Sequence, residues 1–314
     1  MRRLALAALL LAATASSALT APRVVASIMP IHSLVAGVMQ GVGEPELLLS
    51  GQNSEHTAAL TPRQLESLIA ADLVFMVGEG LETKLVQLDG SEAVGGRHFT
   101  ALATAPGVTT LLIRAGGTWE AHDHDHEAGN SGGEADHDHG IAASFDPHVW
   151  LDPANAKAMV AAIAHDLAAA DPAHAAAYSA NATAMESQLD DLKASLAARL
   201  AYVQDRPFIV FHDAYHYFEQ AFDLSGVGSI SNIAGTAASA QRLKEITQRI
   251  RDTDARCIFR EPQFPERAVT AISADAGIKV GVLDALGATL SPGPQAYASL
   301  LDGLADNLIA CLGP

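Results

Sequence analysis

Positive charge, cysteine and aromatic residues are scarce in this chain of 314 residues, where aromatics make up only 5%. The 19 Lys and Arg are outnumbered by 36 Asp and Glu, which leaves a formal net charge of −17 at pH 7. Such an acidic chain repels nucleic acid and anionic lipid, so we expect no nucleic-acid partner. After the N-terminus, no apolar run reaches the roughly 18 residues that suggest a membrane span. Hydrophobic residues still make up 49%, which is ample for packed cores and excludes wholesale disorder.

Residues 1–21 are typical of a secretory signal peptide, because two arginines are followed by an apolar stretch and then by small residues. Cleavage after Ala18 and cleavage after Ala21 both fit this pattern. The alternative, a buried first helix, is disfavoured because the segment has no polar face. The sequence therefore predicts a soluble exported protein, which in a Gram-negative cell is periplasmic.

The two cysteines, Cys257 and Cys311, are predicted to form a disulfide, since an exported protein meets an oxidising compartment. A bridge that closes about 55 residues would stabilise the fold by roughly 4 kcal/mol in the chain-entropy model. Two buried free thiols are the alternative. A cysteine zinc site is disfavoured, because the sequence has no C-x-x-C spacing.

Apolar runs that predict strands alternate with helical patterns in both halves of the chain, which indicates an α/β fold with mostly parallel sheets. Strands are expected at 23–29, 46–49, 71–77, 109–113, 208–211, 226–230, 257–259 and 280–283.

A long helical pattern over 172–203 separates the two halves. It keeps one apolar stripe over several turns and predicts a rod of roughly 45 Å that could connect two lobes. The stripe consists of Met185, Leu189, Leu192, Leu196, Leu200 and Val203. We therefore expect an N-terminal α/β lobe at 22–171 and a C-terminal α/β lobe at 204–314.

Residues 115–144 interrupt the first lobe with a segment rich in His, Asp, Gly and Ala, which is interpreted as a flexible surface loop. A flexible tract can wrap a metal but loses chain entropy in doing so, so we expect a second, weaker and less selective metal site. The alternative is a solvated tract with no specific role. The histidines of this loop are His122, His124, His126, His137 and His139.

Three further histidines lie near strand ends or in loops: His56 in SEHT, His148 in DPHVWLDP and His212 in FIVFHDA. The ends of parallel strands are where open α/β sheets place ligands, and neutral imidazole is a good ligand for Zn²⁺. Taken singly, each histidine would more often be a hydrogen-bonded surface or core residue. Together they predict one metal site.

Five segments, in order, carry a resemblance to a known family: SEHTAALTPRQL, FDPHVWLDP, FHDAYHYFEQAFDL, REPQF and VLDALG. They resemble the zinc-binding proteins of bacterial high-affinity zinc ABC importers, the ZnuA-type periplasmic solute-binding proteins. The resemblance covers nearly the whole mature chain. It implies two α/β lobes joined by a rigid helix, with Zn²⁺ bound in the cleft between them by His56, His148 and His212.

The resemblance leaves three alternatives for a fourth ligand. Glu55 stands where some family members supply a carboxylate and is favoured slightly, Asp284 matches the aspartate of manganese-binding relatives, and water is the third option. Those relatives carry a carboxylate in place of His212, so histidine there fits Zn²⁺ and disfavours Mn²⁺.

Several neighbours of these histidines are candidates for supporting roles. Asp146 and Asp213 could orient ligand imidazoles, or could serve only as a helix cap or a surface charge. Glu261 is expected to brace the lobe interface, through Arg260. His216 would share a helical face with His212, but it is not assigned as a ligand.

The resemblance implies a monomeric carrier that delivers zinc to the membrane permease of an ABC importer. The rival functions are a zinc hydrolase, a manganese or iron carrier and a passive zinc buffer. An enzyme is disfavoured because the sequence has no H-E-x-x-H spacing and no evident general base.

Overall fold

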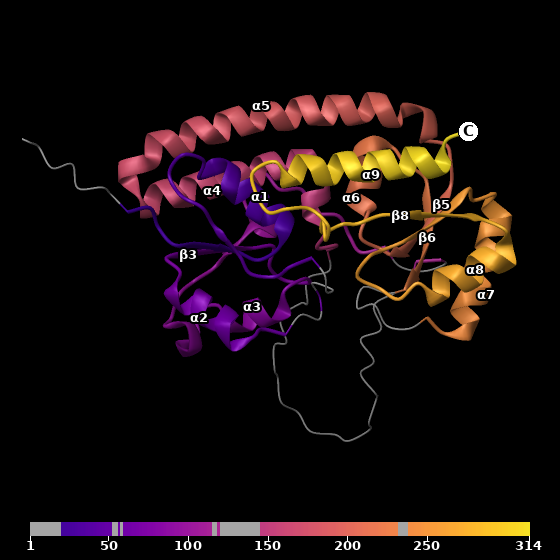
Figure 1. Ribbon diagram of the computed structural model, residues 1–314, viewed down its shortest axis with the longest axis horizontal. Coiled ribbons are helices and arrows are strands. Elements are labelled where there is room, and N and C mark those ends of the chain that lie inside the picture. The colour runs from indigo at the N-terminus through magenta and orange to yellow at the C-terminus, as the bar shows by residue number, and fades with distance from the viewer. Residues whose placement is uncertain (1–19, 52–55, 57–58, 115–117, 120–144, 232–237) are drawn as a thin grey trace, which may run out of the picture.

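Two α/β lobes lie side by side beneath a long helix in the computed structural model (Figure 1). The structure describes residues 20–51, 56, 59–114, 118–119, 145–231 and 238–314. The prediction of two lobes with parallel sheets and a joining helix is confirmed. Over the described part of the chain, no helix has the length and hydropathy needed to cross a bilayer.

The N-terminal sheet has four parallel strands in the order β2-β1-β3-β4. Neighbouring residues of β1 enter different cores, Val24 and Ala26 on the side of α1 and α4, and Val25 on the side of α2 and α3. Thr61 caps α2 with a capping box, as its Thr-Pro start suggests. The elements are β1 (Val24–Ala26), α1 (Met29–Val38), β2 (Glu46–Leu47), α2 (Pro62–Ala70), β3 (Leu73–Met76), α3 (Thr83–Leu88), β4 (Thr100–Ala101) and α4 (Pro153–Ala170), with 3₁₀ turns at Glu92–Val94, Leu102–Thr104 and Val149–Leu151.

The C-terminal sheet repeats this topology with the order β6-β5-β7-β8, again parallel throughout. Ile209 and Phe211 of β5 share a core with α7 and α8, whereas Phe208 and Val210 share one with α6 and α9. The elements are β5 (Phe208–His212), α6 (His216–Phe222), β6 (Gly226–Ser231), α7 (Ala240–Thr253), β7 (Cys257–Arg260), α8 (Arg267–Ala276), β8 (Lys279–Val282) and α9 (Ala296–Leu312).

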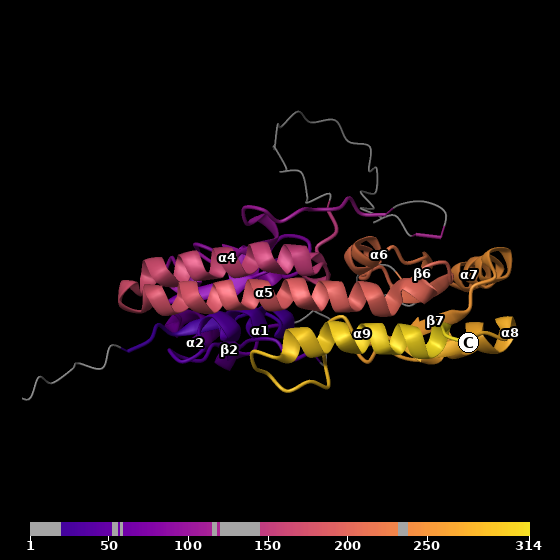
Figure 2. The ribbon, with the colours of Figure 1, turned by 90° about the horizontal axis from the view of Figure 1, so that it is seen from above.

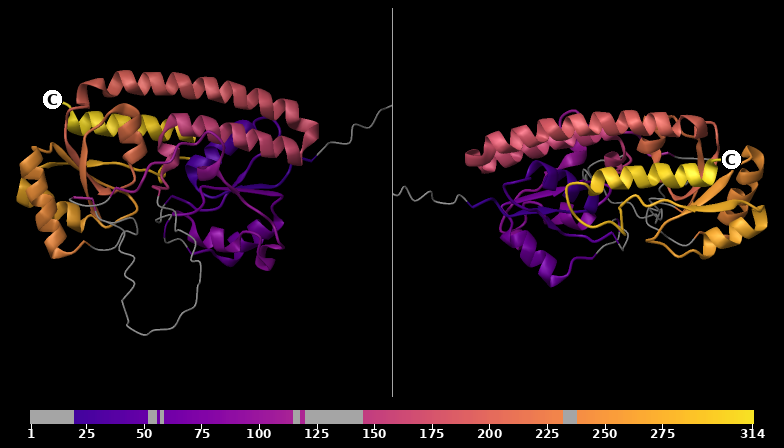
Figure 3. Two further views of the ribbon diagram at one scale, coloured as in Figure 1. Left: turned by 180° about the vertical axis from the view of Figure 1, so that it is seen from behind. Right: turned by 45° about the horizontal axis from the view of Figure 1, so that its top comes forward.

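The joining helix α5 (Ala175–Leu200) runs for 26 residues, and 3₁₀ turns at Pro172–His174 and Ala201–Val203 extend it at both ends. Its predicted apolar stripe is buried, except that Leu192 is only partly buried. Helix α9 packs on both α1 and α5, and the views from above and behind show α5 and α9 running side by side as a helical layer along the top of the molecule (Figures 2 and 3). One core cluster contains residues of both lobes, so the lobes are fused along this helical layer.

The strand expected at 109–113 does not form. The backbone N–H of Thr109 donates to the side-chain oxygen of Asn155, and that of Leu111 donates to the Tyr217 hydroxyl. These side chains take up donors that a neighbouring strand would need, and the unpredicted strand β4 occupies the edge of the sheet instead.

A disulfide joins Cys257 at the start of β7 to Cys311 near the end of α9, with 6.1 Å between the Cα atoms. The predicted pairing is confirmed, and it excludes a zinc site built from these two cysteines.

Candidate metal site

The three predicted histidines converge between the lobes although they are far apart in the sequence. His212 is the last residue of β5, His148 directly precedes the 3₁₀ turn before α4, and His56 lies between β2 and α2. Their ring centroids are 5.3 to 6.2 Å apart. One ligand atom from each lies within 4.8 Å of the others, the one such group of three or more candidate ligands among the residues that the structure describes. One cation can therefore contact all three rings.

Burial differs among the three rings. His148 and His212 are 0% and 1% exposed, whereas His56 is only partly buried. The Trp150 ring lies 5.2 Å from His148, and the Phe264 ring lies 5.3 Å from His212. These aromatic walls exclude water, which strengthens electrostatic interactions with a bound cation.

A buried carboxylate fixes the ring of His148. Asp146 Oδ1 accepts a hydrogen bond from His148 Nδ1 at 2.7 Å and another from the His148 backbone N–H at 3.0 Å. The Tyr217 hydroxyl donates to the Asp146 backbone carbonyl at 2.7 Å. Because Nδ1 carries the proton shared with Asp146, Nε2 is the nitrogen of His148 that can coordinate a metal.

The ring of His212 is held in the same way, by Glu261. Their Nδ1 and Oε1 atoms are 2.8 Å apart, and both side chains are buried. This corrects the predicted role of Glu261, because Arg260 instead pairs with the exposed Glu266 at 3.0 Å. Strands β5 and β7 are neighbours, so Glu261 at the end of β7 reaches His212 across the sheet edge.

Asp213 follows His212 but serves another purpose. It pairs with Arg114, which also donates to Glu219 at 2.6 Å and stacks on Trp119 at 3.5 Å from the ring centroid. Burial alone would lower the pKa of Arg114, but the carboxylates of Glu219 and Asp213 outweigh it and raise this pKa. The cluster attaches Arg114 and Trp119 to the C-terminal lobe, and no motif in the sequence singles out Arg114.

His216, on α6, lies beside this cluster rather than in the triad. Its Nδ1 is 3.8 Å from Asp146 Oδ2. Burial, together with the positive charge of Arg114, lowers the pKa of His216.

Asp284, one of the alternatives for a fourth ligand, accepts four hydrogen bonds from its own surroundings. Its carboxylate accepts from three consecutive backbone N–H groups, those of residues 286–288, and from the side chain of Gln263. The other carboxylate alternative, Glu55, and the histidines of the 115–144 segment lie outside the described residues.

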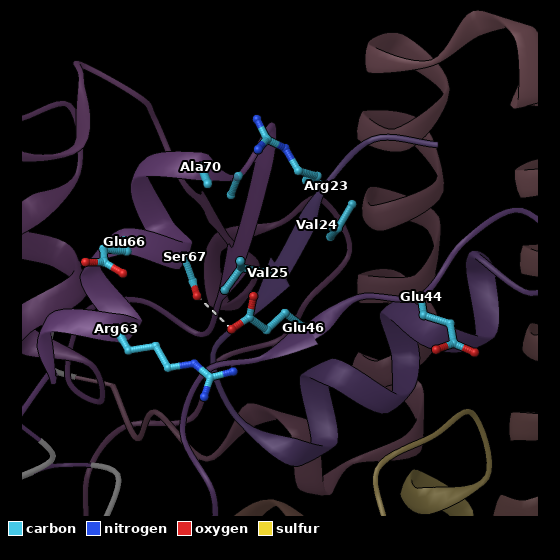
Figure 4. Close-up of a pocket in the computed structure, with 10 residues that line it drawn as sticks. Arg23, Val24, Val25, Glu44, Glu46, Arg63, Glu66, Ser67 and Ala70 are labelled. Carbon is cyan, nitrogen blue, oxygen red and sulfur yellow. Dashed lines mark hydrogen bonds between the residues drawn. The ribbon is translucent and has the colours of Figure 1, made fainter. Parts of the chain in front are cut away.

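A pocket of about 410 Å³ at the amino end of β1 provides a contrast (Figure 4). Its lining includes no histidine or cysteine. Glu46 accepts a hydrogen bond from Ser67, and arginines stand among the carboxylates. This pocket therefore lacks the imidazole and thiolate donors that zinc prefers.

Comparison with known proteins identifies the family. The family described as "Zinc-uptake complex component A periplasmic", ZnuA, matches residues 24–311. The chain belongs to this family. The high-affinity zinc uptake system protein ZnuA of Brucella abortus (strain 2308) is 41% identical and is covered over 97% of its length by 98% of this chain. ZnuA of Yersinia pestis is 33% identical over a match that covers 94% of this chain and 92% of that protein. ZnuA proteins are periplasmic solute-binding components of zinc uptake and not enzymes.

Solved structures agree with this assignment. A zinc-bound ZnuA deletion mutant matches 94% of this chain and 99% of its own, with a TM-score of 0.73 and 26% identity. The periplasmic zinc-binding protein TroA from Treponema pallidum matches with a TM-score of 0.75 and 23% identity, which supports the fold.

Proposed function

We propose that this ZnuA-family protein captures Zn²⁺ between its lobes through the Nε2 atoms of His56, His148 and His212. The convergence of three imidazoles, two of them oriented by buried carboxylates, is the observation that carries this proposal. Nitrogen donors suit Zn²⁺ better than Mn²⁺, which prefers oxygen. The zinc-bound relative supports the same cargo.

For the fourth ligand, we propose Glu55 or water. The four hydrogen bonds that Asp284 accepts weigh against its swinging to the metal, because each would have to be broken. Glu55 directly precedes His56, so both could approach the cation from the same segment.

The cargo passes from this protein to the membrane permease of an ABC importer, and the carrier is a monomer. Membership of a zinc-uptake complex supports such a partner. Residues 1–21 act as a signal peptide that is cleaved on export to the periplasm. The family match supports this, since it begins at residue 24. The lobes comprise residues 22–171 and 204–314, with the 172–203 rod between them.

The five histidines of the 115–144 segment form a second, weaker zinc site. The test is isothermal titration of the protein with residues 120–140 deleted. The deletion should remove a low-affinity zinc equivalent and leave the tight one, whereas an unchanged stoichiometry would contradict the second site.

The primary site is tested by replacing His148 and His212 together with alanine and titrating zinc in competition with a chelator. Tight binding should be lost while the fold, followed by circular dichroism, is kept. The exposed pair His98 and His165, replaced in the same way, is the matched control. Tight zinc binding by the first variant would overturn the proposed function.

A further inference from the structure

One tryptophan of the N-terminal lobe is bonded twice to the C-terminal lobe. Trp150 lies in the 3₁₀ turn Val149–Leu151, two residues after His148, and is 0% exposed. Its indole Nε1 donates to the Ala285 carbonyl at 2.9 Å, and its own backbone carbonyl accepts from the Tyr297 hydroxyl at 2.7 Å. Ala285 follows β8 and Tyr297 belongs to α9, so two buried hydrogen bonds fix Trp150 to the C-terminal lobe.

The chain on the other side of His148 is tied to the C-terminal lobe as well. The hydroxyl of Tyr217, a buried residue of α6, donates to the Asp146 carbonyl at 2.7 Å and accepts from the Leu111 N–H at 2.9 Å. Asp146 precedes His148 by two residues, just as Trp150 follows it by two. This short segment is therefore bonded to the C-terminal lobe at both of its ends.

The turn that accepts the indole N–H is itself fixed to the strand that supports His212. Asp284 accepts hydrogen bonds from the three backbone N–H groups that follow Ala285. At the start of this turn, the Leu283 N–H donates to the carbonyl of Arg260, the last residue of β7, at 3.0 Å. Arg260 directly precedes Glu261, whose carboxylate holds the His212 ring. The same framework thus reaches both buried histidines.

We propose that Trp150 and Tyr217 are positioning residues that set the distance between His148 and His212, each by fixing the chain on one side of His148 to the C-terminal lobe. The inference rests on the proposed function of the triad. The two rings come from different lobes, and their centroids are 5.3 Å apart. Zinc affinity rises when the protein fixes such a distance, because less order has to be imposed on binding.

The experiment measures the zinc affinity of the full mature chain by competition with a chelator. Trp150→Phe keeps an aromatic ring beside His148 and removes the indole N–H, whereas Tyr217→Phe keeps its ring and removes the hydroxyl. Each variant should bind zinc about tenfold more weakly, as is usual when a partner that supports a metal ligand is lost. Melting curves establish that each variant folds, and Tyr217→Phe carries the test if Trp150→Phe does not fold.

A second background separates positioning from a merely structural role. In a protein that already carries His212→Ala, there is no distance between the two rings left to set. Adding Trp150→Phe or Tyr217→Phe should then lower the remaining zinc affinity by less than about twofold. A role confined to packing, or to the orientation of His148 alone, predicts the same loss of affinity in both backgrounds.

The matched control is Tyr178→Phe. It also removes the hydroxyl of a buried tyrosine, whose partner Asp171 lies 2.9 Å away near the start of α5. This variant should melt at a lower temperature, because a hydrogen bond is lost, but should bind zinc with the wild-type affinity.

Wild-type zinc affinity in both Trp150→Phe and Tyr217→Phe would overturn this proposal and leave the proposed function intact. Equal losses of affinity with and without His212 would also overturn it. Tight zinc binding that survives the loss of His148 and His212 together would instead count against the triad itself.

Discussion

The two lobes share one topology but hold their metal-binding histidines differently. The C-terminal lobe has strands of four to six residues, and His212 is the last residue of its first strand, where Glu261 braces it. The N-terminal lobe has strands of two to four residues. Its first strand is followed by Ser27, which bonds Glu82 instead of facing the metal, and His56 comes from the segment after the edge strand β2.

This difference suggests a division of roles. The buried, carboxylate-braced pair of His148 and His212 forms a preorganised half-site, because their rings keep one tautomer and one orientation. His56 completes the site from the connection between β2 and α2, and its ring is only partly buried. The continuous core along the helical layer keeps the lobes together.

The largest expected effect is the loss of stability on removing the disulfide of the C-terminal lobe. Replacing Cys257 and Cys311 by serine should lower the free energy of unfolding by about 4 kcal/mol, from the entropy of closing a 54-residue separation. Zinc affinity should change less than about twofold, because the bridge lies at the amino end of β7 and Glu261 follows its carboxyl end. Denaturant titration measures the free energy of unfolding, and chelator competition measures the zinc affinity. A loss of zinc affinity that accompanies the loss of stability would contradict the prediction that the disulfide and the metal site are independent.

The three histidines should differ when replaced singly. A zinc site worth roughly 10–16 kcal/mol divides among four ligands to about 3 kcal/mol each, so His148→Ala or His212→Ala should cost about 100-fold in affinity. His56→Ala should cost about tenfold, since its ring is partly exposed and water can replace it. Competition titrations measure the zinc affinity of all three variants. Equal losses of affinity would contradict the difference between the His148–His212 pair and His56.

The next largest effect is expected from replacing the carboxylates that hold the two buried rings. Asp146→Asn and Glu261→Gln should each lower zinc affinity by about 10- to 100-fold, because the imidazole they orient loses its fixed tautomer. Asp213→Asn is the control. Asp213 adjoins His212 in sequence but pairs with Arg114. The zinc affinity of this variant should therefore stay within about twofold of wild type, and melting curves confirm that it folds. A large loss in this control would show that adjacency, not the observed pairing, matters.

The smallest effect is a pH dependence within the N-terminal lobe. His32 of α1 is 6% exposed and donates from Nε2 to the Pro45 carbonyl at 3.0 Å; burial lowers the pKa of His32 below its ordinary 6.5. The unfolded chain therefore binds a proton that the folded protein does not. Stability is complete above about pH 6.5 and is lost as the pH falls toward the lowered folded pKa.

In the zinc-free protein, His32→Gln should reduce the slope of the free energy of unfolding against pH. The reduction should be less than about 1.4 kcal/mol per pH unit, the limit for one proton. Denaturant titrations between about pH 7 and 5 check the slope. The exposed His165→Gln should leave the slope unchanged. If the slope of stability against pH is the same in His32→Gln as in the wild type, His32 is not the source of this pH dependence.

Local patterns in the sequence account for much of the fold. The stripe of α5, the Thr61 cap of α2 and the apolar strands are visible because helices and strands repeat at fixed periods. The expected strand at 109–113 failed because Asn155 and Tyr217, distant in sequence, take its N–H groups. No local period carries that information.

The same reasoning explains the site. The histidines follow strand ends or precede helices, so their placement could be predicted, and the resemblance named the three that the structure brings together. The pairing of His212 with Glu261 spans 49 residues, and that of Arg114 with Asp213 spans 99. The first pairing depends on the order of strands within the sheet, and the second on the path that residues 109–114 take along the C-terminal lobe. Neither can be read from the sequence.

X-ray absorption at the zinc edge of the mature protein loaded with one equivalent of zinc tests the central claim most directly. The account predicts three imidazole nitrogens at about 2.0–2.1 Å with one oxygen, and two imidazoles in the His56→Ala protein. A wild-type shell with fewer than three imidazoles, or one that His148→Ala and His212→Ala leave unchanged, would contradict it.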